Sequence, residues 1–283
     1  MRSKLFVPGG RPELFAKALA GDADALSFDL EDSVADNRKA IARQAVGSFL
    51  ASEAALQSAK LLIVRTNPVA SPYFGDDLAA IVGAGIALIN LPKVESATEI
   101  LVAVEVLQRV EAAHGLDRPI SLLVNIETPR GLLRADQIAG AHPRVAGLQL
   151  GMADMFEPHG IDRRDPANVH AAMFAVRMAA AQAGLFALDG ARADIDDTEG
   201  FSEEARMARR LGYLGKSCVH PRQVPLANAA FAVSEEDIAA ARRIVEAAKT
   251  ASEQGLGAFM VDGKMIDLPF LKRAQALLAA HER

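Results

Sequence analysis

Cysteine is nearly absent from this sequence: of 283 residues, only Cys218 is a cysteine. One thiol excludes an intramolecular disulfide and a zinc site built from several cysteines, and it is typical of a reducing compartment. Long apolar segments are also missing, because no run approaches the ~20 residues of a membrane-spanning helix. The apolar stretch within MRSKLFVPGG at the N-terminus is too short for a signal peptide. These absences predict a cytoplasmic protein.

An excess of positive charge is likewise lacking. Lys and Arg number 31 against 36 Asp and Glu, so the formal net charge is −5. Nucleic-acid binding relies on clustered Lys and Arg, and this balance argues against nucleic acid as the main partner. The sequence also has no Gly/Ser linker and no low-complexity segment. Hydrophobic residues make up 51% of the chain, which is ample for a buried core.

What the sequence does contain is a regular alternation of short apolar runs and longer segments with helical spacing. The apolar runs lie at residues 3–7, 25–30, 60–64, 86–91, 120–126, 145–150, 184–188 and 213–219. Helical spacing is clearest at 95–114 and 165–184, and the second of these opens with Asp-Pro and closes at a glycine. Apolar strands separated by helices indicate parallel βα units, and eight of them favour a (β/α)₈ TIM barrel over an open sheet.

The same alternation predicts the domain organisation. Residues 1–230 are expected to form the barrel, which is the catalytic domain, and residues 231–283 a C-terminal helical extension with a helix at 234–254. A barrel of this class typically has about 250 residues, so the length suits a single barrel with a short addition.

Charged residues gather directly after the predicted strands. They are Asp29, Glu31, Asp32, Arg65, Lys93, Glu95, Glu127, Asp154, Asp189, Arg192, Lys216 and His220. The loops that follow the strands build the active-site face of such a barrel. The pattern therefore predicts a functional site at this end of the strands.

Glu127 and Asp154 follow neighbouring strands, so their carboxylates can converge on one point. Two hard oxygen ligands without a His or Cys suit Mg²⁺ or Mn²⁺, which takes its remaining oxygens from water and substrate. Gly131 and Gly151 nearby would let the backbone approach a ligand. The alternative is that Glu127 caps the following turn and Asp154 pairs with an arginine.

Several short segments, in order along the chain, resemble the citrate lyase β-subunit-like family of the HpcH/HpaI aldolase superfamily. They are RSKLFVPG, DALSFDLEDSV, VRTN, LPKVE, IETPRG, LGMADM, GYLGKSCVHPRQV and VDGKMIDLP. The family includes malyl-CoA, citramalyl-CoA and citryl lyases. The resemblance implies a (β/α)₈ barrel, a Mg²⁺ bound by Glu127 and Asp154, and an Arg65 that binds the carboxylate of a 2-oxo acid. It also implies making or breaking a carbon–carbon bond between that acid and an acyl-thioester enolate.

The chemistry that the residues themselves allow agrees with this reaction. Cleavage of a 3-hydroxyacyl thioester needs a Lewis acid, a cation for the distal carboxylate and an acid/base for the thioester carbon. Arg65 can hold a carboxylate through two parallel hydrogen bonds, which lysine cannot. No Ser-His-Asp pattern surrounds Cys218, which argues against covalent catalysis. Lys93 and Lys216 are better placed as partners of phosphate, CoA or carboxylate groups than as Schiff-base lysines.

Three further acids follow the second strand. Asp29, Glu31 and Asp32 are expected to lie near enough to the metal to contact its bound waters, and such contacts orient the direct ligands. For Asp32 an equal alternative is capping of a helix at 35–50.

The C-terminal segment GAFMVDGKMIDLPFLKRAQALL carries a short strand-like run and then a helix with an apolar face. That face must be buried against the same barrel or a neighbouring subunit. In the lyases that the sequence resembles, an aspartate of this segment completes the active site of the adjacent subunit. Its position here corresponds to Asp267, with Asp262 in reserve, which implies a homotrimer or other homo-oligomer. Asp267 before Leu268-Pro269 is also a common helix start.

Three functions from different classes fit the sequence. The first is a Mg²⁺-dependent lyase or synthase that acts on a CoA thioester and glyoxylate, pyruvate or oxaloacetate. The second is a metal-dependent aldolase that acts on free hydroxy-oxo acids. The third is a subunit whose thioester sits on an acyl-carrier protein. The retained DGKMID segment favours the first over the third.

Overall fold

The computed structural model describes residues 1–83 and 85–281 of the chain. By the density of internal contacts the chain divides into two compact units, Met1–Phe231 and Ala232–Arg283. The first contains the strands of a barrel, and the second contains two helices and a small hairpin.

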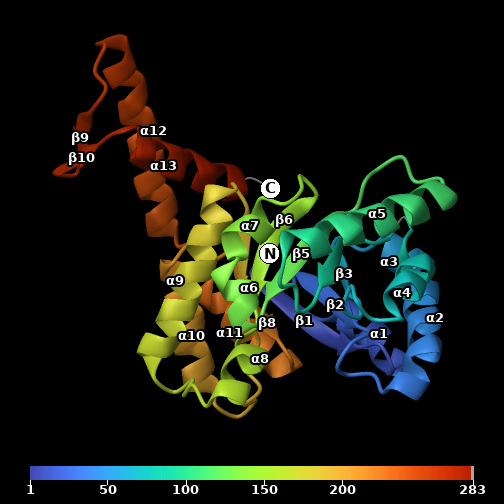
Figure 1. Cartoon of the computed structure of the whole chain (residues 1–283). Helices are drawn as coiled ribbons and strands as arrows, with labels where there is room; N and C mark the ends of the chain where they lie inside the picture. The colour runs from blue at the N-terminus through green and yellow to red at the C-terminus, as the bar shows by residue number, and fades with distance from the viewer. Residues whose placement is uncertain (84, 282–283) are drawn as a thin grey trace. The chain divides into compact units, whose positions relative to one another are not determined.

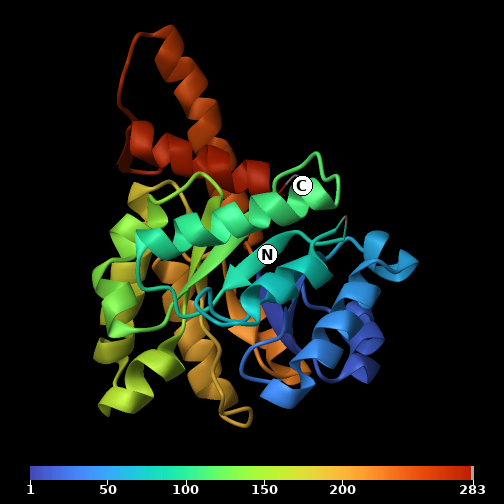
Figure 2. The same ribbon diagram turned by 45° about the vertical axis from the view of Figure 1, so that its right-hand side comes forward.

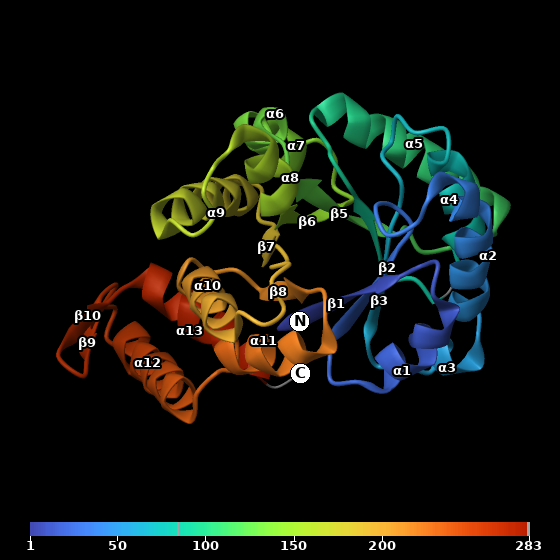
Figure 3. The same ribbon diagram turned by 90° about the horizontal axis from the view of Figure 1, so that it is seen from below.

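The first unit is built on eight parallel strands that close into a barrel in chain order, with the helices on the outside (Figures 1 and 3). The strands are β1(Ser3–Pro8), β2(Ala25–Asp29), β3(Leu61–Arg65), β4(Leu88–Leu91), β5(Ser121–Ile126), β6(Val145–Leu150), β7(Phe186–Asp189) and β8(Gly215–Cys218). Closure is direct, because Lys4 of β1 lies in register with both Ala25 of β2 and Ser217 of β8. The predicted (β/α)₈ fold is therefore confirmed.

Helices lie between successive strands and after β8, and they cover the outer faces of the strands; Figure 2 shows the long helix α5 lying across the outside of the sheet. They are α1(Phe15–Ala20), α2(Lys39–Leu50), α3(Glu53–Leu56), α4(Phe74–Ile81), α5(Ala97–Ala113), α6(Pro129–Leu133), α7(Ala135–Ala139), α8(Met152–Phe156), α9(Pro166–Gln182), α10(Thr198–Arg210) and α11(Val224–Ala230). Capping residues in the sequence fix where several of these helices begin. Ser96 accepts a hydrogen bond from the Glu99 amide at the start of α5, and Asp165 accepts one from the Ala167 amide ahead of Pro166. Both are standard N-terminal caps.

The alternation of side chains along each strand separates two interiors. Outward-facing residues such as Leu26, Phe28 and Val64 pack with the helices in one continuous hydrophobic core. The inward positions in the middle of the barrel are instead polar and buried: Lys4, Ser27, Asn90, Asn125, Gln149 and Ser217. Because buried polar groups are costly unless they are hydrogen-bonded, this layer indicates a functional interior and not only a packed one.

The second unit consists of α12(Glu235–Glu253), the antiparallel pair β9(Phe259–Val261) and β10(Lys264–Ile266), and α13(Leu268–His281). Ala274 of α13 is buried, whereas Leu268 at the start of this helix is 57% exposed. None of the helices in the described parts of the chain has the length and apolar character needed to cross a membrane.

Candidate active site

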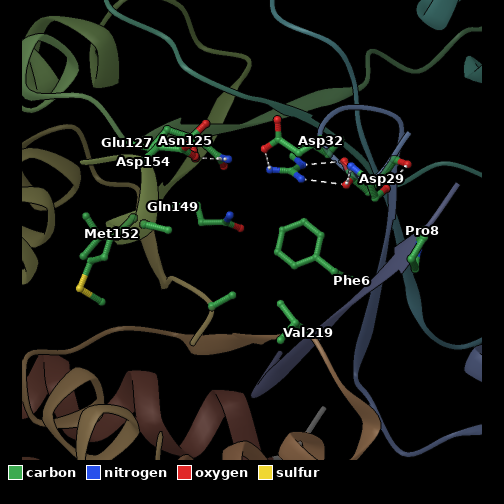
Figure 4. Close-up of a pocket in the computed structure, with 16 residues that line it drawn as sticks. Phe6, Pro8, Asp29, Asp32, Asn125, Glu127, Gln149, Met152, Asp154 and Val219 are labelled. Atoms are coloured by element: carbon green, nitrogen blue, oxygen red, sulfur yellow. Dashed lines mark hydrogen bonds and ion pairs between the residues drawn. The ribbon is translucent and has the colours of Figure 1, made fainter. Parts of the chain in front are cut away.

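A cavity of about 440 Å³ opens at the carboxyl ends of the barrel strands (Figure 4). Its walls come from strands β1, β2, β3, β5 and β6 and from the segments that follow β2, β5, β6, β7 and β8. The lining residues are Phe6, Pro8, Asp29, Asp32, Ser33, Arg65, Asn125, Glu127, Gln149, Leu150, Gly151, Met152, Ala153, Asp154, Ala191 and Val219. Five of the predicted site residues, Asp29, Asp32, Arg65, Glu127 and Asp154, thus face one space.

Glu127 is almost fully buried and is held at both carboxylate oxygens. Its Oε1 accepts a hydrogen bond from the main-chain N–H of Lys93 at 2.7 Å, and its Oε2 accepts one from Asn125 Nδ2 at 3.1 Å. Burial raises the pKa of Glu127, and the charge of Arg65 acts in the opposite direction. Gly151 leaves room for this carboxylate, because a Cβ there would come within 2.4 Å of Oε2.

Asp154 lies on α8, directly after β6, and shares the cavity with Glu127 (Figure 4). Its negative charge contributes to the raised pKa of Glu127, so the two carboxylates repel each other. A divalent cation between them would relieve this repulsion. No cluster of three or more His, Cys, Asp or Glu side chains with metal-binding geometry occurs within residues 1–83 and 85–281. Two carboxylates that leave other positions to water and substrate oxygens fit Mg²⁺ or Mn²⁺.

Arg65 is fixed by three acids, one at the end of β2 and two in the loop after it. Its Nε and Nη2 donate to the two oxygens of Asp29 at 2.7 and 2.8 Å, and its Nη1 lies 2.8 Å from Glu31 Oε2 and 3.6 Å from Asp32 Oδ2. Asp29 therefore occupies the edge of the guanidinium that Nε and Nη2 form. One N–H on each of Nη1 and Nη2 remains, and a substrate carboxylate can accept from these two.

Glu31 and Lys93 form a second ion pair beside Arg65. Lys93 Nζ lies 2.7 Å from Glu31 Oε1 and 3.1 Å from Asp32 Oδ1. Burial raises the pKa of Glu31 to about 7, against the lowering effect of Arg65 and Lys93. Lys93 has a φ of +52°, which is uncommon for a residue other than glycine. This backbone conformation accompanies the amide contact with Glu127.

The predicted contacts of Asp29, Glu31 and Asp32 with metal-bound water stay a prediction. In the structure these acids contact Arg65 and Lys93, and Asp29 also accepts from the amides of Glu31 and Ser33. Asp32 does not cap the next helix: Ala35 and Arg38 occupy the capping positions of the turn at Asp36–Arg38 and of α2.

Lys216 does not line the cavity. It is fully buried behind the barrel, where its Nζ donates to Asp189 Oδ2 at 2.7 Å and to Glu204 Oε1 of α10 at 2.5 Å. The expectation of a carboxylate partner holds for Lys216, as it does for Lys93.

Asp267 and Asp262 belong to the second unit. The main-chain oxygen of Asp267 accepts from the Leu271 amide at 3.1 Å, so Asp267 stands at the start of α13, yet its Oδ1 is buried without a hydrogen-bond partner among the described residues. Asp262 is exposed and pairs with Arg243 at 2.9 Å. A catalytic role of either residue stays a prediction.

Sequence reasoning missed Asn125, which holds Glu127, and its buried polar neighbours Gln149 and Lys4. Asn125 and Gln149 line the cavity, and Lys4 is buried beneath them. A signal was available, because a polar residue at an inward position of an otherwise apolar strand is unusual in a barrel core.

A barrel with two carboxylates, an arginine and a cavity at the carboxyl ends of its strands defines a class of metal-dependent lyases and aldolases that act on small acids. Residues 2–221 match the model of the family described as HpcH/HpaI aldolase/citrate lyase. The chain belongs to this family, and the resemblance noted in the sequence is confirmed.

Individual relatives cover almost the whole chain. The citrate lyase subunit beta of Escherichia coli (strain K12) is 36% identical over 99% of this chain and 93% of its own length. The L-malyl-CoA/beta-methylmalyl-CoA lyase of Cereibacter sphaeroides (strain ATCC 17025 / ATH 2.4.3) is 32% identical over 99% of this chain and 94% of its own.

Solved structures agree with the sequence relatives. The CitE protein of Mycobacterium tuberculosis, in complex with magnesium, acetoacetate and coenzyme A, is 33% identical and covers 100% of both chains with a TM-score of 0.76. The citrate lyase beta subunit of M. tuberculosis, complexed with oxaloacetate and magnesium, is 32% identical over 82% of this chain and 97% of that one, with a TM-score of 0.68.

Proposed function

We propose that this chain is a Mg²⁺-dependent carbon–carbon lyase or synthase that cleaves or forms a 3-hydroxyacyl-CoA, of the malyl-CoA or citramalyl-CoA type, from an acyl-CoA and a 2-oxo acid. The observation that carries the proposal is the convergence of Glu127, Asp154 and Arg65 on one cavity. Relatives named as malyl-CoA lyase, and a solved relative holding magnesium and coenzyme A, support the same chemistry.

Each of these residues has a distinct task. Glu127 and Asp154 would hold the Mg²⁺, which when bound supplies a Lewis acid that polarises an oxygen of the oxo acid. Lys93 and Asn125 keep the Glu127 carboxylate in place through its two oxygens. Arg65 binds the carboxylate of the oxo acid through the N–H groups that Asp29 and Glu31 leave unused.

The acid/base is assigned to Asp267 of a neighbouring subunit. In the condensation direction its carboxylate accepts the proton from the methyl carbon of the thioester, and in cleavage it returns the proton to the enolate carbon. The unpartnered, buried Oδ1 of Asp267 supports a role beyond capping α13. A site shared between subunits requires an oligomer, for which we propose a homotrimer.

A second candidate function is that of a citryl lyase subunit that receives its thioester on an acyl-carrier protein. The 36% identity with proteins named citrate lyase subunit beta favours this candidate. A metal-dependent aldolase acting on free hydroxy-oxo acids is the remaining alternative. We also propose a cytoplasmic location, which rests on the single, buried Cys218.

The test is a screen of acetyl-CoA and propionyl-CoA against glyoxylate, pyruvate and oxaloacetate in the presence of Mg²⁺. We expect condensation with at least one pair and none after chelation of the metal. Activity only with a thioester on an acyl-carrier protein would establish the second candidate. Cleavage of free hydroxy-oxo acids, without any reaction of the thioesters, would overturn both and leave the aldolase.

A further inference from the structure

Gln149 lies at the inner end of the cavity and is not used by the site described above. It is 3% exposed, it lines the cavity, and Figure 4 shows its side chain pointing into that space. It stands in register with Asn125 of β5, so the two amides come from neighbouring strands.

Lys4 fixes which end of the Gln149 amide faces the cavity. The Nζ of Lys4 donates to Gln149 Oε1, and Ser217 Oγ donates to the same oxygen at 3.5 Å. Lys4 Nζ also lies 3.5 Å from Asn90 Oδ1. This oxygen is an acceptor as well, because the Nδ2 of Asn90 donates to the main-chain oxygen of Leu123 and to Asn125 Oδ1. An amine that donates to two carbonyl oxygens leaves the NH₂ group of Gln149 on the opposite side.

The Nε2 of Gln149 has no hydrogen-bond acceptor among the described residues. This atom is not buried by protein but is open to the cavity. An amide donor that is nine-tenths buried, held from behind and open to a cavity is a preorganised binding group. A ligand oxygen that accepts from it completes a set of hydrogen bonds which the protein alone leaves incomplete.

The charge beneath Gln149 indicates what kind of oxygen this is. Lys4 is fully buried and its ammonium lies 4.0 Å from the centre of the Phe6 ring, but no described carboxylate pairs with it. Burial, together with the charge of Arg65, holds the pKa of Lys4 well below its usual range. A negative group that arrives near this end of the cavity would stabilise the buried ammonium.

We propose that Gln149, positioned by Lys4, selects 2-oxo acids that carry a second carboxylate. The inference rests on the proposed lyase function and narrows its oxo acid to oxaloacetate, so that the thioester made or cleaved is of the citryl type and not of the malyl or citramalyl type. With the first carboxylate at Arg65 and the oxo oxygen beside Glu127 and Asp154, the third group on the oxo carbon is hydrogen in glyoxylate, methyl in pyruvate and carboxymethyl in oxaloacetate. An oxygen of the carboxymethyl group accepts from Gln149 Nε2, whereas hydrogen and methyl leave that donor unpaired. Gln149 is thus a specificity-determining residue and Lys4 a positioning residue.

The test compares stable acids that differ only at this group. Malate and lactate are the hydroxy counterparts of oxaloacetate and pyruvate, and calorimetric titration with Mg²⁺ present gives their dissociation constants. We expect the wild type to bind malate at least about tenfold more tightly than lactate, as for a hydrogen bond to a charged group.

Two variants of similar size separate the effect of the Gln149 N–H donor from the effect of the side-chain shape. Gln149→Glu keeps an oxygen for Lys4 but presents a second oxygen to the cavity, so malate should lose affinity by at least about tenfold while lactate changes little. Gln149→Leu should bring the two dissociation constants close together. Lys4→Met should reduce the preference for malate, because the amide is then free to turn. Gln182→Leu, on the exposed face of α9, is the control and should behave as the wild type.

The outcomes are distinct. If the wild type binds both acids equally, or if the Gln149 variants weaken malate and lactate by the same factor, the assignment of Gln149 is wrong and the proposed function stands. If the wild type binds neither acid with Mg²⁺ and condenses no oxo acid, the proposed function fails as well. Circular dichroism and urea unfolding identify any variant that does not fold. For the variants that do fold, the ratio of kcat/KM with oxaloacetate to kcat/KM with pyruvate is the second readout.

Discussion

The main-chain N–H of Lys93, after β4, donates to Oε1 of Glu127, after β5, over 2.7 Å. The hydrogen bond links the ends of two neighbouring strands and does so from a residue with φ at +52°. The side chain of Lys93 meanwhile pairs with Glu31 and Asp32. One residue therefore orients a proposed metal ligand through its backbone and neutralises two acids through its ammonium group.

Replacing Lys93 with Gly and with Ala tests the strain of the backbone at this position. Both variants lose the ammonium group, but only Gly adopts a positive φ without steric cost. We expect the Lys93→Gly variant to be more stable than Lys93→Ala by about 1 kcal/mol in urea unfolding. Equal stabilities, or a more stable Ala variant, would show that the backbone at this position carries no strain.

Removing either carboxylate of the proposed metal site should abolish turnover. We expect Glu127→Ala and Asp154→Ala each to lose Mg²⁺ binding in calorimetric titration and to keep the circular dichroism spectrum of the wild type. Glu127 lies directly after β5 and Asp154 on α8, both outside the hydrophobic core, so the barrel does not depend on them. Full activity of either variant in the presence of a chelator would rule out the two-carboxylate site.

The charge-conserving change Arg65→Lys should be far from neutral. Lysine cannot reproduce the pair of hydrogen bonds to Asp29, nor offer two parallel N–H groups to a substrate carboxylate. We expect a loss of about 2–4 kcal/mol of transition-state binding, measured as kcat/KM. Arg206→Lys, in an exposed pair with Glu199, is the matched control and should change little. An unaltered kcat/KM for Arg65→Lys would remove Arg65 from the site.

Glu31 should make the stability of the metal-free protein depend on pH. Burial raises its pKa from 4.5 to about 7, so the folded state favours the protonated form. That contribution to stability is complete below pH 4.5 and is lost as the pH rises through about 7. Glu31→Gln stays neutral and lacks this loss. We expect the free energy of unfolding of the wild type, relative to the variant, to fall over this range. Parallel curves for the two proteins would contradict the raised pKa.

Mixing two inactive variants tests the proposed sharing of the site between subunits. Asp267→Asn should be inactive with an intact metal site, because proton transfer at the thioester carbon lacks its acid/base. When it is dissociated and reassembled with Glu127→Ala, some interfaces join an intact metal site to an intact tail, and partial activity should return. A monomer in solution, or no recovery in verified mixed oligomers, would leave Asp267 as a residue at the start of α13.

The fold was predictable because the strands alternate with helices that carry their own start signals, such as Ser96 and Asp165. The acids at the strand ends were predictable for a similar reason, since their place in the sequence fixes their place on the barrel. What the sequence could not reveal is pairing across strands. That Asp29 occupies one side of Arg65, and that Lys4 turns the Gln149 amide towards the cavity, depend on the barrel register and on side-chain rotamers.

The three acids around Arg65 have a consequence for the thermodynamics of ligand binding. An arginine on a flexible stem loses rotamer freedom when it captures a carboxylate, and that loss opposes association. Here the guanidinium is already immobilised by Asp29 and Glu31, and only 12% of the side chain is exposed. The ordering therefore takes place during folding, and the arriving acid meets a receptor whose conformation hardly needs to change.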